Sequence, residues 1–341
     1  MTYSIIHFEK NHFQQYEDFL KSFKSGYYSS DSFISRDWWT INSPLRGYIV
    51  FAYTEKEIAS RCIITRRRIN YQDKVVDCYE IGGTCTLPQH QRKGLFTKVV
   101  KQTVELGFGS GTKLIYGTPN NKSGPGYKKL GFSFIDKQDN FLVWLCSPLN
   151  ALLRKLNLNR SPIQNIRTLH SIKSLLHSVK VTELTLEQYI QNTKSFVRMN
   201  HVDEEYLRHR LAVNKNNNRR FFHGSGEKGQ FYCAIREYEL GFLRLLMLSE
   251  YFLDGHIDDT WIKAINARII QRGFYKNTDG IYFKSFIDPS RSRIFDTVLW
   301  RSIVHRRLPI CYTYTGLPKE QVEQMMSQLV QVFQLTDCDI G

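Results

Sequence analysis

The sequence lacks the features that mark membrane-spanning, secreted and metal-dependent chains. No run of about eighteen apolar residues occurs, and the N-terminus has no basic segment followed by an apolar stretch, so neither a membrane span nor a secretion signal is expected. The histidines include no HExxH, and the carboxylates show no DxDxDG spacing, so we expect no bound metal. These absences predict a soluble, cytoplasmic protein whose mature form begins at Met1.

Paired cysteines and short repeats are also missing. The seven cysteines are odd in number and scattered, and none forms a CxxC. Most have strand-like apolar neighbours, which is typical of reduced thiols in the core of a cytoplasmic protein. Cys85 is conceivable as an acyl-accepting nucleophile, but no His or Asp lies near it in sequence, so we expect it to be inert.

Acidic residues are scarce relative to basic ones. There are 32 Asp and Glu against 47 Lys and Arg, which gives a net charge of +15. This excess favours an anionic partner, such as phosphate, nucleic acid or an acidic surface, without choosing among them. Arg66, Arg67 and Arg68 alternate between the faces of a predicted strand, so they form no continuous stripe and we expect no nucleic-acid partner.

The chain is long enough for about two domains. With 42% hydrophobic residues it can form real cores, which excludes a disordered class. After a helical, aromatic-rich start over 1–45, the pattern predicts strands at 47–53, 58–68 and 75–87, a helix at 94–108, a strand at 114–118, a short helical piece in 119–129 and two strands in 132–146. We expect an α/β domain over 1–148.

The second half repeats this order more faintly, which suggests a duplication. Strands are predicted at 231–237, 241–249, 281–286 and 310–314, with helices near 258–270 and 318–333. We therefore expect a second domain over 181–341. Between the two, residues 149–180 are basic, and we interpret them as a linker or docking helix, with a patch for a membrane surface or an acidic partner as the alternative.

The most informative stretch is a strand that runs into the loop Gln91-Arg92-Lys93-Gly94 and then into a helix. The first N–H groups of a helix have no internal partners, its dipole favours negative charge there, and glycine allows close approach of phosphate oxygens. Arg92 and Lys93 add positive charge at the same point. The loop is therefore a candidate phosphate site, although such loops are common.

A second motif follows about thirty residues downstream, with Asn120, Ser123 and the run YKKLGF at 127–132. Together the two motifs resemble the GNAT superfamily of acyl-CoA-dependent N-acyltransferases over roughly residues 1–146. The Q/R-x-x-G-x-G/A loop of that family corresponds to Gln91, Arg92, Lys93, Gly94, Leu95 and Phe96. Its N-x-x-A/S…Y-x-K-L-G-F segment corresponds to Asn120, Ser123, Tyr127, Lys129, Leu130, Gly131 and Phe132. The sequence departs from the pattern at Phe96, where Gly or Ala is usual, and at Gly124-Pro125-Gly126 before the tyrosine.

The resemblance implies an α/β fold of two GNAT-like domains, each a twisted mixed sheet flanked by helices, with acetyl-CoA as the donor. It implies that the backbone of Thr84, Cys85 and Thr86 pairs with the pantetheine arm. It further implies that the amides of 92–97, up to Thr97, hold the pyrophosphate and that Asn120 and Ser123 line the other wall. We expect no CoA in the second domain, because the helix after 253 begins among acids in LDGHIDDTW, so this domain is interpreted as a degenerate copy that walls the acceptor site.

The resemblance also implies the catalytic residues. Glu80 corresponds to the general base of the histone-acetyltransferase branch, acting directly or through water; the alternative is that it pairs with an arginine of the 66–68 run. Tyr127 corresponds to the general acid toward the thiolate, with a core tyrosine as the alternative. His90 is expected to be a solvated loop histidine.

Trp38 and Trp39 precede the first predicted strand, where acceptor-side helices lie in the family. Aromatic side chains there suit a sugar ring or an apolar chain, although packing between domains is the alternative. We expect transfer of an acetyl group to a small primary amine, such as an amino sugar or a nucleotide-linked amino sugar, in a ternary complex. The alternatives are a Fem-like aminoacyl transferase that uses charged tRNA, and a non-catalytic acyl-CoA-binding or scaffold protein.

Overall fold

The computed structural model of the chain divides into two compact units. It describes residues 3–9, 12–22, 45, 47–72, 74–135, 138–145, 152, 155–156, 180–196, 204–212, 219–226, 229–240, 242–255, 279–285, 301–307 and 310–331. The first unit combines 1–137 with 197–216 and 307–333, and the second combines 138–196 with 217–306 and 334–341. Each unit is therefore assembled from both halves of the sequence.

The first unit is built on a seven-stranded mixed sheet with the order β1-β2-β3-β4-β5-β14-β6. Neighbouring strands are antiparallel except for β4 and β5, which are parallel. Its strands are β1 (Ser4–His7), β2 (Gly47–Tyr53), β3 (Ile58–Tyr71), β4 (Lys74–Thr86), β5 (Leu114–Gly117), β6 (Ser133–Ile135) and β14 (Ile310–Tyr314). Its helices are α1 (Phe13–Lys21), the short η2 (Pro88–His90), α3 (Leu95–Gly109), α4 (Gly124–Lys129), α8 (Glu204–Ala212) and α10 (Lys319–Gln331).

The second unit has a sheet of the same plan, with the order β13-β7-β12-β11-β10-β9-β8. The parallel pair of β11 and β12 takes the place of β4 and β5, and β7 lies antiparallel to β12 as β14 lies antiparallel to β5. The strands are β7 (Gln138–Leu145), β8 (Lys180–Leu184), β9 (Arg220–Gly226), β10 (Gly229–Leu240), β11 (Leu243–Gly255), β12 (Gly280–Ser285) and β13 (Arg301–Arg307), with helix α7 (Leu186–Thr193). The matching strand orders support the predicted duplication.

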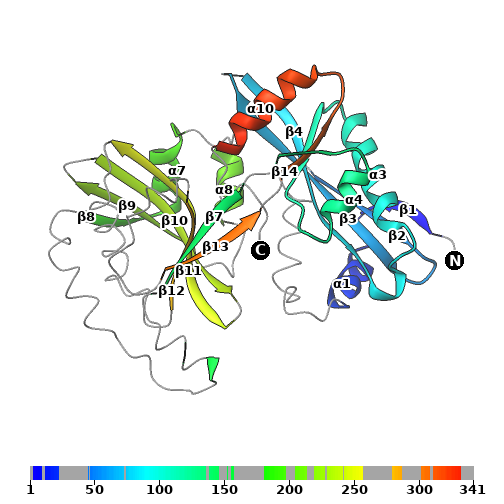
Figure 1. Cartoon of the computed structure of the whole chain (residues 1–341), viewed down its shortest axis with the longest axis horizontal. Helices are drawn as coiled ribbons and strands as arrows, with labels where there is room; N and C mark the ends of the chain where they lie inside the picture. The colour runs from blue at the N-terminus through cyan, green and yellow to red at the C-terminus, as the bar shows by residue number, and fades with distance from the viewer. Residues whose placement is uncertain are drawn as a thin grey trace. The chain divides into compact units, whose positions relative to one another are not determined.

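The two units have exchanged one strand. In Figure 1, β14, from the red end of the chain, lies among the blue and cyan strands of the first sheet, and green β7 lies among the yellow strands of the second. Ile310 pairs with Ile135 of β6, and Cys311 pairs with Gly117 of β5. This division differs from the domain boundaries predicted at 148 and 181, because 138–145 belongs to the second unit and 307–333 to the first.

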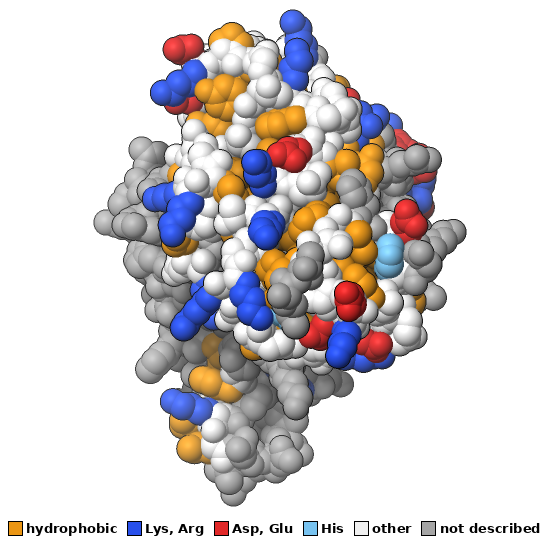
Figure 2. Space-filling model, turned by 90° about the vertical axis from the view of Figure 1, so that its right-hand side faces the viewer, with side chains coloured by type: hydrophobic (Ala, Val, Ile, Leu, Met, Phe, Trp, Pro, Cys, Tyr) orange, Lys and Arg blue, Asp and Glu red, His pale blue; other side chains and the backbone are white. Residues whose placement is uncertain are grey.

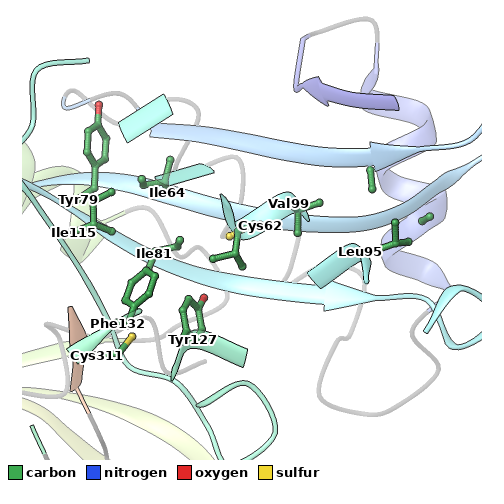
Figure 3. Close-up of a cluster of buried hydrophobic side chains, with 13 residues drawn as sticks. Cys62, Ile64, Tyr79, Ile81, Leu95, Val99, Ile115, Tyr127, Phe132 and Cys311 are labelled. Carbon is green, nitrogen blue, oxygen red and sulfur yellow. The ribbon is translucent and has the colours of Figure 1, made fainter. Parts of the chain in front are cut away.

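Both faces of the first sheet carry apolar clusters. On the α3 side, Val99 and Val100 of the helix pack with Ile64, Ile81 and other core residues, which Figure 3 shows converging from several strands. On the other side, α1 covers the sheet with Tyr16, Phe19 and Leu20. The sheet is therefore enclosed between helices, as the strongly apolar strands predict.

Most predicted elements of the first half are confirmed within one to three residues. The helical start is wrong at 4–7, which forms β1 against β2. The helix predicted near 258–270 lies outside the described residues. Five cysteines (Cys62, Cys78, Cys85, Cys233 and Cys311) are free thiols, and all but Cys85 are buried. In the part of the chain that the structure describes, no helix is long and apolar enough to cross a membrane.

Candidate functional site

The central feature of the first unit is an opening between the parallel strands β4 and β5. They pair only at Tyr79 with Ile115 and at Glu80 with Tyr116, although β4 continues to residue 86. Among the described strands, none pairs with residues 82–86 on the side away from β3, and these five residues are half-buried. The backbone predicted to receive pantetheine, at Thr84, Cys85 and Thr86, is therefore open along one edge.

A β-bulge in β4 accompanies this opening. Arg61 lies opposite Cys85, whereas Ile63 lies opposite Gly82, so β4 contains one extra residue in between. Gly83 in the bulge has a φ of +57°, and a Cβ there would lie 2.8 Å from Cδ1 of Ile63. Only glycine meets both demands without strain. A bulge bends its strand and increases the local twist, and among the described residues β4 has no pairing with β5 beyond Glu80.

The predicted phosphate loop lies directly beyond β4. Residues 91–94 are exposed, and both Arg92 (φ +60°) and Gly94 (φ +72°) are in the left-handed region, which for a non-glycine residue costs on the order of 1 kcal/mol. Gly94 precedes the first turn of α3, which has neither a side-chain cap nor an acidic residue in the described chain. The first N–H groups of α3 are thus available for an anion. Leu95 points into the core, and Thr97 is exposed.

His90 fastens the start of this loop, and the prediction of a solvated histidine is wrong. Its side chain is only 3% exposed. Nδ1 lies 3.0 Å from the Tyr3 hydroxyl of β1, and Nε2 lies 2.8 Å from Oε1 of Glu57 in the β2–β3 turn. The hydrogen bond from His90 is the main reason that the pKa of Glu57 is lowered. The side chain of Gln91 adds a bond of 3.3 Å to the carbonyl oxygen of Thr86.

The surface around the loop, α3 and α4 is strongly basic. Figure 2 shows a face of the molecule on which Lys and Arg side chains outnumber Asp and Glu. Between residues 91 and 131 there are eight exposed basic side chains and one acidic side chain, Glu105. The basic residues are Arg92, Lys93, Lys98, Lys101, Lys113, Lys122, Lys128 and Lys129. Such a surface attracts a polyanion toward the loop.

Tyr127 of α4 lies on the inner side of the opening. It is 3% exposed and belongs to the core cluster, with its ring beside Phe132 in Figure 3. Its hydroxyl lies 3.1 Å from Oγ1 of Thr84, which in turn donates to Sγ of Cys62 at 3.3 Å. Burial raises the pKa of Tyr127 well above its ordinary value of 10, so the hydroxyl is protonated at neutral pH.

Asn120 and Ser123 form the turn that leads from β5 into α4. Oδ1 of Asn120 accepts hydrogen bonds from the backbone N–H groups of Lys122 and Ser123, at 2.9 and 3.0 Å. Oγ of Ser123 accepts from the N–H of Asn120 at 3.1 Å. The two predicted wall residues are thus brought together at the end of β5, where they fix the start of α4.

Glu80 forms an ion pair with an arginine of the 66–68 run, which is the sequence-based alternative to a role as general base. Nε and Nη2 of Arg67 donate to Oε2 of Glu80 at 2.9 and 2.7 Å, and both side chains are buried. Arg66 and Arg68 lie on the opposite face with Asp77, so the predicted alternation of the arginines is confirmed.

A row of paired residues crosses the sheet at Glu80. Thr65, Glu80, Tyr116 and Tyr312 lie opposite one another on β3, β4, β5 and β14, so their side chains share one face. Strand exchange therefore brings Tyr312, from the second half of the sequence, onto the face that carries Glu80.

Sequence reasoning missed a buried cation beside β4. Arg61 is fully buried, its Nη1 donates to the Tyr16 hydroxyl, and its Nε donates to Sγ of Cys85 at 3.2 Å. The sequence signal that could have revealed it is an arginine at a core-facing position of an otherwise apolar strand. Cys85 is thus in contact with a guanidinium at the edge of the opening.

The second unit repeats this arrangement with the opposite charge. Phe221, Ala234 and Glu250 lie opposite one another, as Phe51, Arg61 and Cys85 do in the first unit, and β11 also has a bulge directly before Glu250. The Tyr189 hydroxyl donates to Oε2 of the buried Glu250 at 2.8 Å. A buried carboxylate of β11 therefore occupies the register position that corresponds to Cys85 of β4.

Two further expectations concern the acceptor side and metals. Trp38 and Trp39 lie outside the described residues, so their acceptor role stays a prediction. Within the described ranges, no group of three or more His, Cys, Asp or Glu could hold a metal ion.

Comparison with known proteins agrees with this geometry. Residues 10–135 match the family described as "Acetyltransferase (GNAT) domain", while the comparison with curated proteins gave no match. A probable N-acyltransferase of unknown function from Enterococcus faecalis V583 is similar in structure, with a TM-score of 0.57 and 10% identity over 91% of this chain and 72% of that chain.

Two further solved structures are similar in fold. A GCN5-related N-acetyltransferase from Anabaena variabilis ATCC 29413 has a TM-score of 0.57 and 10% identity over 91% of this chain and 73% of that chain. Eis1 from Mycobacterium abscessus has a TM-score of 0.52 and 11% identity, with 92% of this chain and 73% of that chain covered. The chain therefore contains a GNAT acetyltransferase domain at residues 10–135.

Proposed function

We propose that the protein transfers an acetyl group from acetyl-CoA to a small primary amine, with an amino sugar or a nucleotide-linked amino sugar as the first class of acceptor to test. The observation that carries the proposal is the opening of β4 at residues 82–86, which leads straight into the phosphate loop and the uncapped start of α3. One side of this path offers strand backbone and the other offers helix N–H groups. A pantetheine arm that ends in a pyrophosphate needs both.

We propose that the backbone of Thr84, Cys85 and Thr86 binds pantetheine and that the amides of 92–97 bind the pyrophosphate. Arg92 and Lys93 supply exposed positive charge there. Asn120 and Ser123 shape the opposite wall through the turn that they form. These residues bind and orient the donor so that the thioester lies near the bulge of β4.

Proton transfer is assigned to two side chains. Tyr127 donates a proton to the leaving thiolate, which its protonated, buried hydroxyl next to Thr84 supports. Glu80 accepts the proton of the amine through a water molecule, since Arg67 already donates two N–H groups to its Oε2. We propose that the acceptor binds on the sheet face that Glu80 shares with Tyr312.

The test is a panel of primary amines, including amino sugars, incubated with acetyl-CoA and analysed by mass spectrometry for a gain of one acetyl group. Glu80→Gln should lower kcat about 100-fold and change the pH profile, while the Kd for acetyl-CoA stays within about twofold. Arg66→Gln, on the opposite face of the sheet, is the matched control and should leave kcat unchanged. Acetylation that is equally fast in Glu80→Gln would refute the assignment of the base.

A further inference from the structure

Phe96 and Gly126 depart from the family pattern separately, and the structure joins them in one contact. Phe96 is the second residue of α3, and Gly126 directly precedes Tyr127 in α4. A Cβ on Gly126 would lie 2.4 Å from Cε1 of Phe96 and 2.9 Å from both Cδ1 and Cζ. The phenyl ring therefore occupies the space that any side chain at 126 would need. Each departure is sterically compatible with the fold because of the other.

The same ring contacts Tyr127. The centroids of Phe96 and Tyr127 are 5.4 Å apart at an interplanar angle of 81°, and Phe132 contacts Tyr127 at 5.0 Å and 70°. Edge-to-face contacts of this kind are favourable and directional. Tyr127 is thus held between two aromatic rings, and its hydroxyl is directed to Oγ1 of Thr84 at the opening of β4. Phe96 is the half-buried member of this group.

We propose that Phe96 is a positioning residue for Tyr127, and that Gly126 is the residue that makes room for it. The proposal rests on the proposed role of Tyr127 as the proton donor. In this chain the ring of Phe96, rather than a side chain on α4, fixes the tyrosine ring and so the distance of its hydroxyl from the donor thioester.

A double-mutant cycle separates this role from general packing. The assay measures CoA release from acetyl-CoA with the amine that the wild type acetylates fastest, beside the Kd for acetyl-CoA. Tyr127→Phe should lower kcat about 100-fold, and Phe96→Ala about tenfold with Kd within about twofold, because a displaced hydroxyl transfers a proton poorly. In the Tyr127→Phe background, Phe96→Ala should cause no further loss of kcat. Phe108→Ala, on the same helix and core cluster, is the matched control and should leave kcat unchanged.

Gly126→Ala tests the steric half of the proposal by thermal melting. It should lower Tm in the wild type, because Cβ collides with the phenyl ring, and it should raise Tm or leave it unchanged in Phe96→Ala, where the ring is absent. An equal loss of Tm in both backgrounds would overturn the proposed complementarity.

The possible failures are distinguishable. An equal loss of kcat on Phe96→Ala with and without the Tyr127 hydroxyl would overturn the positioning role and leave the proposed function standing. A wild type that releases no CoA with any amine would overturn the proposed function, and the positioning role with it.

Discussion

Cutting the chain after residue 148 should abolish folding of the GNAT acetyltransferase domain, although residues 1–148 contain every motif that identifies it. The cut removes β14, which lies between β5 and β6 and pairs with four residues of one and three of the other. Unpaired strand edges of this kind promote aggregation.

The size of the effect follows from burial. Ile310, Cys311 and Tyr312 of β14 are 2%, 0% and 3% exposed, and each such side chain contributes about 1.5–3 kcal/mol. Val322, Met325 and Met326 of α10 are equally buried and leave with the strand. The total loss is roughly 9–18 kcal/mol, which is comparable with or larger than the whole free energy of unfolding of a typical domain.

A rearranged chain supplies the matched control. Joining residue 137 directly to residue 308 places only 136, 137, 308 and 309 between Ile135 and Ile310, which are opposite each other in the sheet. A four-residue loop is adequate for a hairpin. Circular dichroism during heating should show a cooperative transition for this chain and none for 1–148. If 1–148 alone melted cooperatively near the Tm of the full protein and bound acetyl-CoA, the assignment of β14 to the first sheet would be refuted.

Three further changes follow from the contacts of the first unit. Glu57→Gln should lower Tm at neutral pH, and this loss of Tm should shrink as the pH falls well below 4.5. A carboxyl whose pKa is lowered on folding stabilises above its ordinary value of 4.5 and loses this contribution as the pH falls through the lowered pKa. An equal difference in Tm at neutral and acidic pH would contradict the role of His90. Gly117→Ala should destabilise by about 1–3 kcal/mol in urea unfolding, because its Cβ would lie 2.5 Å from the carbonyl oxygen of Ile81, whereas Gly124→Ala has nothing within 4 Å and serves as the control. Arg67→Met should lower the free energy of unfolding by about 3–5 kcal/mol, because it removes one partner of a buried ion pair. Arg67→Met combined with Glu80→Leu removes both partners and should lower the free energy of unfolding much less. Similar losses in the single and the double variant would argue against the ion pair as the source of the effect.

The features that depend only on neighbouring residues in the sequence could be predicted. The strands at 47–53 and 310–314 follow from apolar runs between turn residues, and α3 follows from apolar residues at helical spacing. The loop at 91–94 was recognisable because its glycine and basic residues stand between a strand and a helix. Each signal lies within about fifteen residues of the feature that it predicts.

Features that depend on distant partners were not predictable in this way. The apolar pattern of β7 and β14 suits a central strand of either sheet, so it does not specify which sheet each strand joins. His90 looks like a loop histidine until Tyr3, 87 residues away, is known to contact it. Likewise, Arg67 was one of three candidate partners for Glu80, and only the register of β3 against β4 selects it.

Isothermal titration of the full-length protein with acetyl-CoA tests the central claim most directly. We expect one site per chain, weakened by Lys93→Glu at the exposed loop and unaffected by the same charge change in Lys74→Glu, at the exposed start of β4. A stoichiometry of two would contradict the degenerate character of the second unit. No binding at all, or equal weakening by both variants, would contradict the proposal that the opening of β4 and the start of α3 form the donor site.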